Sequence, residues 1–532
     1  MQSWFTFVLD GEDCRVEKED THRTLSSFLV SLDSCFEHLD GHDSWQGGDP
    51  VILGDIEGDR HHFRVVDAGL ILMPMLAGRQ VWTPEGIQNA EPDHPVNLAL
   101  QNNHLECSRE RLGSLKVLLF EGYYRPDLRR LGQSNDQFDC LVTRTTNAPA
   151  IRESAAQVFA STLQLRHEAA QKAERSGDES SVWTGRRDIF EDRFSRQLFQ
   201  LSERPAINYV DKEKRRFYRP GTLVELLRLK REYPEARFIA GGTDVGSQDD
   251  LAEWPNLISL ESVPELTSFA TTEEAWEIGS ALPLTEIGEL IGRECPPFLK
   301  LLRRFASRPI RNRATLGGYL ASSWTNGQLT PLLLSMNARV LLLSDNGERD
   351  APLSQFFDEN GETILAPDEV IRSIILPRFT DSVLGDRGIT SALIDSYTVA
   401  PRRTLCRPYA TAAFSLEFRD RTIAKARIAY SGISEVPVRV REAEEFLAGK
   451  TWNEKTAFET LPILNESLPV AEGTDPAREH MADASYRRQL VVTLFQKFYS
   501  QHPRPDSRLP ENLSANEDFV RLDQPFFDVI EG

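Results

Sequence analysis

The sequence predicts an α+β protein of several domains, and three observations carry this prediction. The chain has 532 residues, 40% hydrophobic and 27% charged, and is long enough for three or four domains with full cores. An alternating apolar and polar pattern up to about residue 85 is typical of a small β-rich domain, and a helical pattern follows over 95–173. An apolar strand that runs into a double glycine at 237–246 lies within a further α+β domain.

The segments between these patterns predict linkers and a bridging helix. The helical stretch breaks near Arg125 and Asn147, and the polar, aperiodic residues 174–181 mark a linker. RRDIFEDRFSRQLFQL (186–201) predicts a helix that bridges to the next domain. The tail from Pro503 is acidic and rich in proline but ends in the apolar FVRLDQPFFDVI, so it packs either on its own chain or on a partner.

Charge, hydropathy and cysteine content exclude several classes of protein. A net charge of -20 argues against nucleic acid or an anionic membrane as partner. The longest apolar run, GLILMPML (69–76), is too short to span a bilayer and contains a proline, and the first residues lack the basic region of a secretion signal. Six cysteines without a C-x-x-C pair indicate reduced thiols, so we expect a cytoplasmic protein.

The segment RFIAGGTDVG (237–246) has the form of a strand that feeds a phosphate-binding loop. Glycines let backbone N–H groups approach a pyrophosphate closely, and the hydroxyl of Thr243 offers one more donor. Double-glycine turns also occur in many unrelated proteins, so a plain tight turn is the alternative interpretation. The ligand-loop interpretation involves Phe238, Ile239, Ala240, Gly241, Gly242, Thr243, Asp244 and Val245.

A second glycine loop lies some seventy residues further on, in FASRPIRNRATLGGYLASS (305–323). The spacing of GGTDVG and TLGG resembles the FAD domain of the molybdenum hydroxylases, the family of xanthine dehydrogenase and of carbon monoxide dehydrogenase flavoprotein subunits. PDEVIRSIILPR (367–378) is similar to the closing strand of that domain, and ARIAYSGISEVPVRVREAEEFLAGKTW (426–452) to the small domain that follows it. The resemblance to this flavoprotein part covers roughly residues 205–500.

The resemblance implies an FAD site, in which most family positions are retained and several polar ones are changed. Tyr319 replaces the asparagine of the family, Gln328 an aspartate, and Thr398 a lysine. Leu405 and Cys406 stand where the family often has an acidic pair. Gln328 can still hydrogen-bond a hydroxyl group. A Tyr319 ring that points inward would occupy pyrophosphate volume, whereas one that points outward would leave the site open. The retained positions are the loop Ala240–Val245 together with Phe305, Thr315, Gly317, Gly318, Val370 and Ile371.

The first 165 residues resemble the iron–sulfur half of the same family. WFTFVLDGEDCRVE is similar to the opening hairpin of a plant-type ferredoxin. In the family this fold holds one 2Fe-2S cluster on four cysteines, but here the four positions fall at about Gly41, Gln46, Asp49 and Gly69. Thiolates hold such clusters, so this set holds none.

A second set of four cysteines belongs, in the family, to the helical domain that follows. Here Cys107 is retained, its partner position is Glu110, and the last pair falls near Val142 and Arg144, with Cys140 close by but displaced. One ligand in eight cannot hold two clusters, so no 2Fe-2S cluster is expected. An H-x-x-C pair that ends at Cys107 has no second half, so we assign no metal site, and no catalytic residue is identified.

The resemblance and the composition together imply six segments. We expect a degenerate β-grasp ferredoxin-like domain over 1–88, a degenerate helical domain of the 2Fe-2S-binding type over 89–173, a linker over 174–207, a PCMH-type FAD-binding α+β domain over 208–380, an α+β domain like the C-terminal domain of CO dehydrogenase flavoprotein over 381–500, and an acidic tail over 501–532.

The resemblance further implies a function and a partner. We expect the FAD-binding subunit of a xanthine-dehydrogenase-like molybdenum hydroxylase, an oxidoreductase subunit that transfers electrons through FAD without iron–sulfur clusters in this chain. A molybdopterin-binding large subunit would be its partner in a hetero-oligomer. One alternative is a cofactor-free scaffold or assembly subunit of a molybdoenzyme, favoured by the lost cluster ligands. A second is a stand-alone flavoprotein oxidase, although no substrate base is evident in the sequence.

Overall fold

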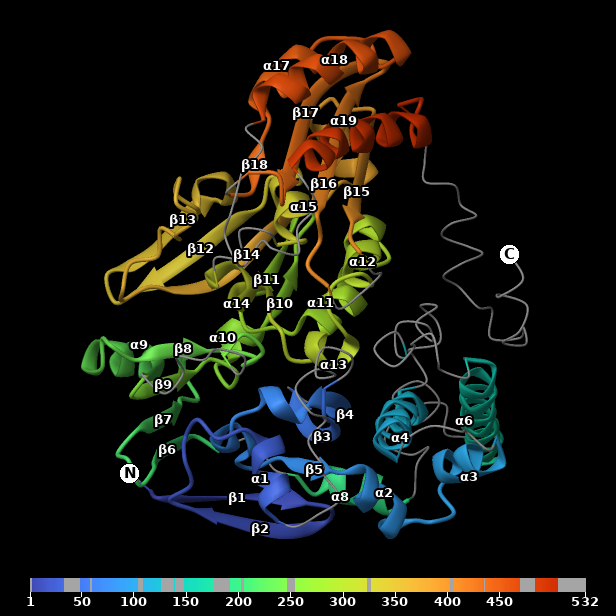
Figure 1. Ribbon diagram of the computed structural model, residues 1–532, viewed down its shortest axis with the longest axis vertical. Helices are drawn as coiled ribbons and strands as arrows, with labels where there is room; N and C mark the ends of the chain where they lie inside the picture. Colours follow the sequence, from blue (N-terminus) through green and yellow to red (C-terminus); the bar gives the residue numbers. More distant parts are fainter. Residues whose placement is uncertain are drawn as a thin grey trace.

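The structure, a computed structural model, has mixed α+β architecture with four β-sheets among the residues it describes. These residues are 2–32, 48–57, 60–103, 109–125, 138, 148–176, 192–201, 205–245, 254–322, 327–401, 406–434, 436–468 and 484–505. In Figure 1 the amino-terminal sheet lies at one end of the molecule, the carboxy-terminal sheet and its helices lie at the other, and two sheets lie between them. The expected α+β class is confirmed.

The amino-terminal domain is a mixed five-stranded sheet of order β2-β1-β5-β3-β4. Strands β1 and β2 form the expected hairpin, and β1 pairs with β5 in parallel. Helix α1 begins after Thr24, whose hydroxyl accepts a hydrogen bond from the Ser27 amide and so caps the helix. The elements are β1 (Trp4–Leu9), β2 (Glu12–Glu17), α1 (Leu25–Ser31), β3 (Pro50–Glu57), β4 (Arg60–Asp67), the 3-10 turns η2 (Ala68–Leu70) and η3 (Met73–Leu76), and β5 (Gln80–Trp82).

Helices follow, and they break where the sequence predicts. Helix α4 ends at Tyr124 and α6 begins at Ala148. His94 packs within an aromatic cluster that includes Phe120 and Phe194, and burial there lowers its pKa to about 3, so the ring is a neutral core residue. The helices are α2 (Pro84–Ala90), α3 (Pro95–Asn102), α4 (Arg109–Tyr124), α6 (Ala148–Ser176) and the bridging α8 (Arg193–Phe199).

The glycine loop at 237–246 follows a strand of the next sheet, whose order is β6-β7-β9-β8. This sheet shares one hydrophobic core with the amino-terminal domain, in which Phe5 and Phe7 lie with Tyr209, Phe217 and Ile239. The two parts are therefore packed as one body at this point. The elements are β6 (Ile207–Val210), β7 (Arg216–Arg219), α9 (Leu223–Glu232), β8 (Arg237–Ile239) and β9 (Asn256–Ser259).

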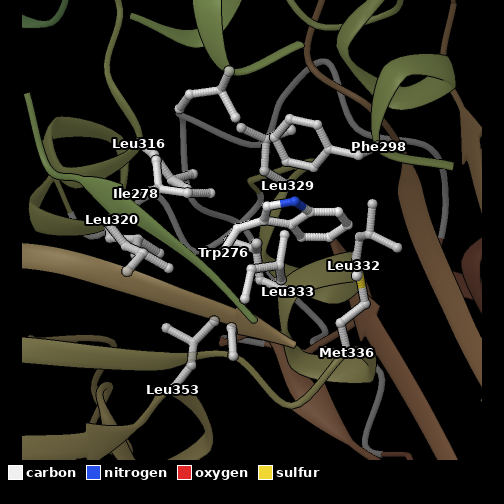
Figure 2. Packing of buried hydrophobic residues seen from close by; sticks show 14 of the residues in the cluster. Trp276, Ile278, Phe298, Leu316, Leu320, Leu329, Leu332, Leu333, Met336 and Leu353 are labelled. Atoms are coloured by element: carbon white, nitrogen blue, oxygen red, sulfur yellow. The ribbon is translucent and has the colours of Figure 1, made fainter. Parts of the chain in front are cut away.

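A third sheet, of order β10-β11-β14-β12-β13, carries the second glycine loop on its helical layer. Trp276 and Ile278 of its strand β11 pack against leucines of α14 and α15, so one core fixes both helices (Figure 2). The elements are α10 (Pro264–Thr267), β10 (Phe269–Thr271), β11 (Ala275–Gly279), α11 (Leu284–Ile291), α12 (Pro296–Leu302), α13 (Arg308–Arg311), α14 (Leu316–Ala321), α15 (Thr330–Ser335), β12 (Arg339–Ser344), β13 (Gly347–Pro352), η7 (Leu353–Gln355) and β14 (Val370–Pro377).

The carboxy-terminal domain is an antiparallel sheet, β15-β16-β17-β18, packed against helices that follow it in the chain. Buried Asp395 of β15 ties it to its neighbours, because the carboxylate accepts hydrogen bonds from Lys300 of α12 at 2.7 Å and from Tyr397 at 2.9 Å. The elements are α16 (Asp381–Asp386), β15 (Ser391–Val399), β16 (Ala410–Arg419), β17 (Thr422–Ser431), β18 (Val438–Arg439), α17 (Arg441–Leu447), α18 (Glu454–Ser467) and α19 (Ala484–Gln501).

Buried ion pairs join the amino-terminal parts to the third sheet. Arg308 of α13 donates to Glu121 of α4 at 2.8 Å, and both side chains are almost fully buried. Arg125 binds Glu289 at 2.8 Å, and Arg64 binds Glu286 at 3.1 Å. A charge buried without its partner is costly, so these pairs hold the domains in one arrangement. In the described part of the chain, no helix is long and apolar enough to cross a membrane.

Candidate flavin site

The first glycine loop leaves β8 between two close neighbours. A Cβ on Gly241 would overlap the backbone carbonyl of Arg313, so only glycine fits there. Gly242 has a φ of +79°, and a Cβ on it would lie 3.2 Å from the Leu70 carbonyl oxygen and 3.3 Å from Met75 Sδ. Packing alone therefore requires both glycines, as the plain-turn interpretation of the motif holds.

The hydrogen-bond donors of this loop go beyond a plain turn. The backbone N–H groups of Gly241, Gly242 and Thr243 donate to no residue that the structure describes. Gly241 and Gly242 are buried, and a buried N–H group without an acceptor costs free energy. Three adjacent backbone donors on a glycine turn form a concave anion site. The arrangement fits a phosphate group that the loop would bind.

Most backbone N–H groups of the second loop donate hydrogen bonds within the protein. Thr315 caps α14 by accepting from the Gly318 N–H at 3.0 Å, and the Gly317 N–H donates to the Ser280 carbonyl at 3.0 Å. The hydroxyl hydrogen of Thr315 has no described acceptor, so it remains available to a ligand. A Cβ on Gly318 would lie 4.0 Å from Ala240 Cβ, which places the two loops side by side.

Tyr319 points toward the start of α15. Its hydroxyl oxygen accepts from the backbone N–H of Leu329 at 3.0 Å and of Thr330 at 3.2 Å, and it lies 3.0 Å from Thr330 Oγ1. The ring packs edge-on against Phe305, at a centroid distance of 5.7 Å. Burial raises its pKa to about 12, so the phenol stays neutral. The side chain is thus anchored in the protein, on the side of the second loop that faces α15.

The other changed positions have different surroundings. Gln328 is 6% exposed, and its amide bonds to no described residue, so it stays available to a ligand. Thr398 is buried, its hydroxyl lies 3.3 Å from that of Thr411, and its carbonyl accepts from Arg304 at 3.2 Å. The guanidinium group of Arg304 therefore lies beside Thr398, the position where the family commonly has a lysine. Leu405 is outside the described residues, and Cys406 is half-buried.

The apolar site residues fall into two adjoining clusters. Phe238 and Ala240 pack against a hydrophobic cluster that includes Val370 of β14. Ile371, the next residue of β14, lies in the core that also contacts Phe305 and Tyr319. Strand β14 thus contributes neighbouring residues to both clusters. Ile239 points away from these clusters into the core shared with the amino-terminal domain, and Asp244 and Val245 complete the loop.

Sequence reasoning missed three residues beside the loops. Arg313 donates through Nε to the Gly241 carbonyl at 3.3 Å and through Nη2 to Glu261 at 2.9 Å, and both side chains are buried. Ser280 carries a buried hydroxyl that has no hydrogen-bond partner in the described part, and it touches Gly317. The one sequence signal for the contact of Arg313 with the first loop was its position inside the second motif. A charged residue is otherwise expected on the surface.

The expected positions of the lost iron–sulfur ligands can be followed only in part. Asp49 and Gly69 are described, and a single carboxylate joins them: Asp67 Oδ1 accepts from the Gly69 N–H at 2.9 Å and from the Asp49 N–H at 3.3 Å. Asp49 in turn accepts from the Ser26 hydroxyl. Glu110 lies on α4. Gly41, Gln46, Cys107, Cys140, Val142 and Arg144 lie outside the described residues.

Asp67 makes the stability of this region depend on pH. Burial raises its pKa from 3.8 to about 6, against the opposing effect of the two N–H donors. The folded chain then keeps a proton that the unfolded chain has lost between about pH 4 and pH 6, so stability falls as pH rises through that window. We expect Asp67→Asn to raise the free energy of unfolding by about 1–2 kcal/mol above pH 6 and to flatten this dependence.

Thermal unfolding of wild type and variant from pH 4 to pH 8 measures this effect. The control is Asp345→Asn, which changes an exposed carboxylate whose ion pair with Arg231 is open to solvent. Parallel pH curves for wild type and Asp67→Asn would show that the carboxyl ionises normally.

Comparison with known proteins supports the same class of site. Residues 212–379 match the family model described as the FAD binding domain in molybdopterin dehydrogenase, and residues 395–502 match the CO dehydrogenase flavoprotein C-terminal domain. Both glycine loops lie in the first match. An FAD-binding domain followed by this C-terminal domain defines a flavoprotein. Through these two matches the chain is similar to the flavoprotein component of the molybdenum hydroxylase family.

Individual relatives are distant in sequence. Xanthine dehydrogenase of Emericella nidulans is 24% identical over 538 residues, an alignment that covers 93% of this chain and 38% of that protein. Xanthine dehydrogenase 2 of Arabidopsis thaliana is 27% identical over 325 residues, 56% of this chain and 23% of that protein. The chain thus spans only a quarter to two-fifths of the length of these relatives.

A solved structure of carbon monoxide dehydrogenase from Hydrogenophaga pseudoflava, in a form that lacks the Mo-pyranopterin moiety, is also similar. It has 21% sequence identity and a TM-score of 0.47, and the match covers 53% of this chain and 94% of that one.

In the described part of this chain, no three histidine, cysteine, aspartate or glutamate side chains gather closely enough to hold a metal ion.

Proposed function

We propose that this chain binds FAD between its two glycine loops and serves as the flavin subunit of a xanthine-dehydrogenase-like molybdenum hydroxylase. The observation that carries the proposal is the set of three unused N–H donors at Gly241, Gly242 and Thr243, two of them buried. They lie beside Thr315, whose hydroxyl is also free to donate. Backbone donors and a hydroxyl suit the diphosphate of a dinucleotide.

Each part of the site has a distinct task in this proposal. The N–H groups of the first loop and the Thr315 hydroxyl bind the diphosphate, and the Gln328 amide hydrogen-bonds a hydroxyl group of the cofactor. Phe305, Val370 and Ile371 supply the apolar walls that exclude water. When bound, FAD supplies one- and two-electron redox chemistry. The substrate would be oxidised on a separate molybdopterin-containing subunit, which makes the protein part of a hetero-oligomer.

Flavin and iron content of the purified full-length chain test the proposal. We expect a flavin absorption spectrum, roughly stoichiometric release of FAD on denaturation, and no iron or acid-labile sulfide, because seven of the eight inferred ligand positions lack a thiol. A colourless chain that does not take up added FAD would overturn the proposal. Stoichiometric iron would overturn the assignment of the lost cluster ligands.

A cofactor-free scaffold is the second candidate function. The changes at Tyr319, Gln328 and Thr398 favour it, as do the buried ion pairs that attach the helical region around α4 to the third sheet. It predicts that a colourless chain would still bind the molybdopterin-containing subunit. Co-purification of the two subunits from cells depleted of flavin distinguishes this candidate from the first, which requires bound FAD for electron transfer.

A further inference from the structure

The amino-terminal domain touches the first glycine loop directly. The turns η2 and η3 form a wall against Gly242, since the Leu70 carbonyl and Met75 Sδ would lie at 3.2 and 3.3 Å from a Cβ there. Val245 also packs on the core that this domain shares with β8. The domain that carries none of the expected cluster cysteines at Asp49 and Gly69 thus forms one side of the loop.

A buried chain of charged side chains links this domain to the same loop. Arg79 donates from Nη2 to Glu261 Oε2 at 2.8 Å, and Arg313 donates from Nη2 to the same oxygen at 2.9 Å. Arg313 then reaches the Gly241 carbonyl at 3.3 Å. Arg79 is itself fixed by Asp55 at 3.0 Å and by the Met75 carbonyl at 3.0 Å. Every side chain of this chain of contacts is buried.

We infer that the amino-terminal domain has kept a structural role, which is to support the first glycine loop. Arg79 is the positioning residue, because it holds Glu261, which in turn holds Arg313 against the Gly241 carbonyl. A guanidinium group donates several hydrogen bonds in a fixed plane, so it can hold a shared carboxylate in one place. A displaced Glu261 would release Arg313, and with it the carbonyl of Gly241. The backbone that carries the three N–H donors would then shift. The inference rests on the proposed function.

Arg79→Met tests the inference, with Arg64→Met as the matched control. Arg64 is also a buried arginine of the amino-terminal domain with an ion pair across the domain boundary, but that pair is with Glu286 and involves neither Glu261 nor Arg313. We expect Arg79→Met to raise the Kd for FAD about tenfold, as the loss of a charged hydrogen bond would, and Arg64→Met to change it less than about twofold. Equal Kd values for the two folded variants would overturn the inference.

Hydrogen exchange of the chain without FAD provides a readout that does not depend on cofactor binding. We expect amide exchange at 239–245 to accelerate in Arg79→Met and to stay unchanged in Arg64→Met. If wild type binds no FAD, the proposed function fails, whereas unchanged exchange at 239–245 would overturn the support by Arg79. Glu261→Gln is the second variant, because it keeps the shape of the side chain. If Arg79→Met does not fold, we expect amide exchange at 239–245 to accelerate in Glu261→Gln instead. Unchanged exchange in that variant would overturn the inference.

Discussion

Replacing Gly318 by leucine is expected to abolish FAD binding and leave the chain folded. A Cβ at 318 would meet Thr315 Oγ1 at 3.0 Å and Ala240 Cβ at 4.0 Å, so the new side chain would enter the space between the two glycine loops. That space adjoins the free N–H groups of the first loop, where the diphosphate is proposed to lie. We expect the Kd for FAD to rise at least about a hundredfold in a titration followed by flavin fluorescence.

Gly385→Leu is the matched control for this substitution. Gly385 also lies in a short helix, α16, and a Cβ there would meet nothing within 4 Å. Leucine favours a helix more than glycine does, so neither variant should lose stability through the backbone. A folded Gly318→Leu protein that binds FAD as tightly as Gly385→Leu would place the cofactor elsewhere.

Gly242 is the less informative position for such a test. Its φ of +79° disfavours any side chain, and its Cβ would point at Leu70 and Met75 of the amino-terminal domain. A large residue there would separate that domain from the loop, and loss of FAD would then have two causes. Gly318 is the better test position, because a Cβ there would point between the two glycine loops, whereas a Cβ on Gly242 would point at the amino-terminal domain.

The sequence predicted well whatever depends on local backbone and periodicity. The strand before the first loop is β8, the apolar run in PDEVIRSIILPR is β14, and the helical stretch breaks after Tyr124 and before Ala148. Both glycine motifs also lie side by side, as a shared site requires. Each of these features follows from hydrophobic pattern and from the conformational freedom of glycine, which act over short stretches of chain.

Features that depend on contacts between distant segments were not predictable. Nothing near Arg79 in the sequence announces that it shares a carboxylate with Arg313. The raised pKa of Asp67 likewise depends on burial that a charged residue at a strand end does not signal. The direction of Tyr319 was open for the same reason, because the first turn of α15, ten residues further on, provides its hydrogen-bond donors.

Tyr319 separates the flavin subunit from the scaffold more directly than any other residue. If its ring occupied diphosphate volume, shortening it to asparagine would open the site and tighten FAD binding. The ring is instead tied to Leu329 and Thr330 and packs on Phe305, so it supports α15 and the neighbouring Gln328. Removing it should therefore loosen that side of the site.

We expect Tyr319→Asn to lower the free energy of unfolding by about 3–5 kcal/mol, because it leaves a cavity and two N–H groups without their acceptor. FAD binding should weaken by about three- to tenfold rather than tighten. Tyr319→Phe keeps the ring and should cost about 1–3 kcal/mol with little change in Kd. Tyr397→Phe is the control, since its hydroxyl also bonds two partners, Asp395 and Gln501, in the carboxy-terminal domain. Chemical denaturation and FAD titration measure both quantities, and a tenfold tighter Kd in Tyr319→Asn would mean that the ring fills the pocket and that the wild-type chain is the scaffold.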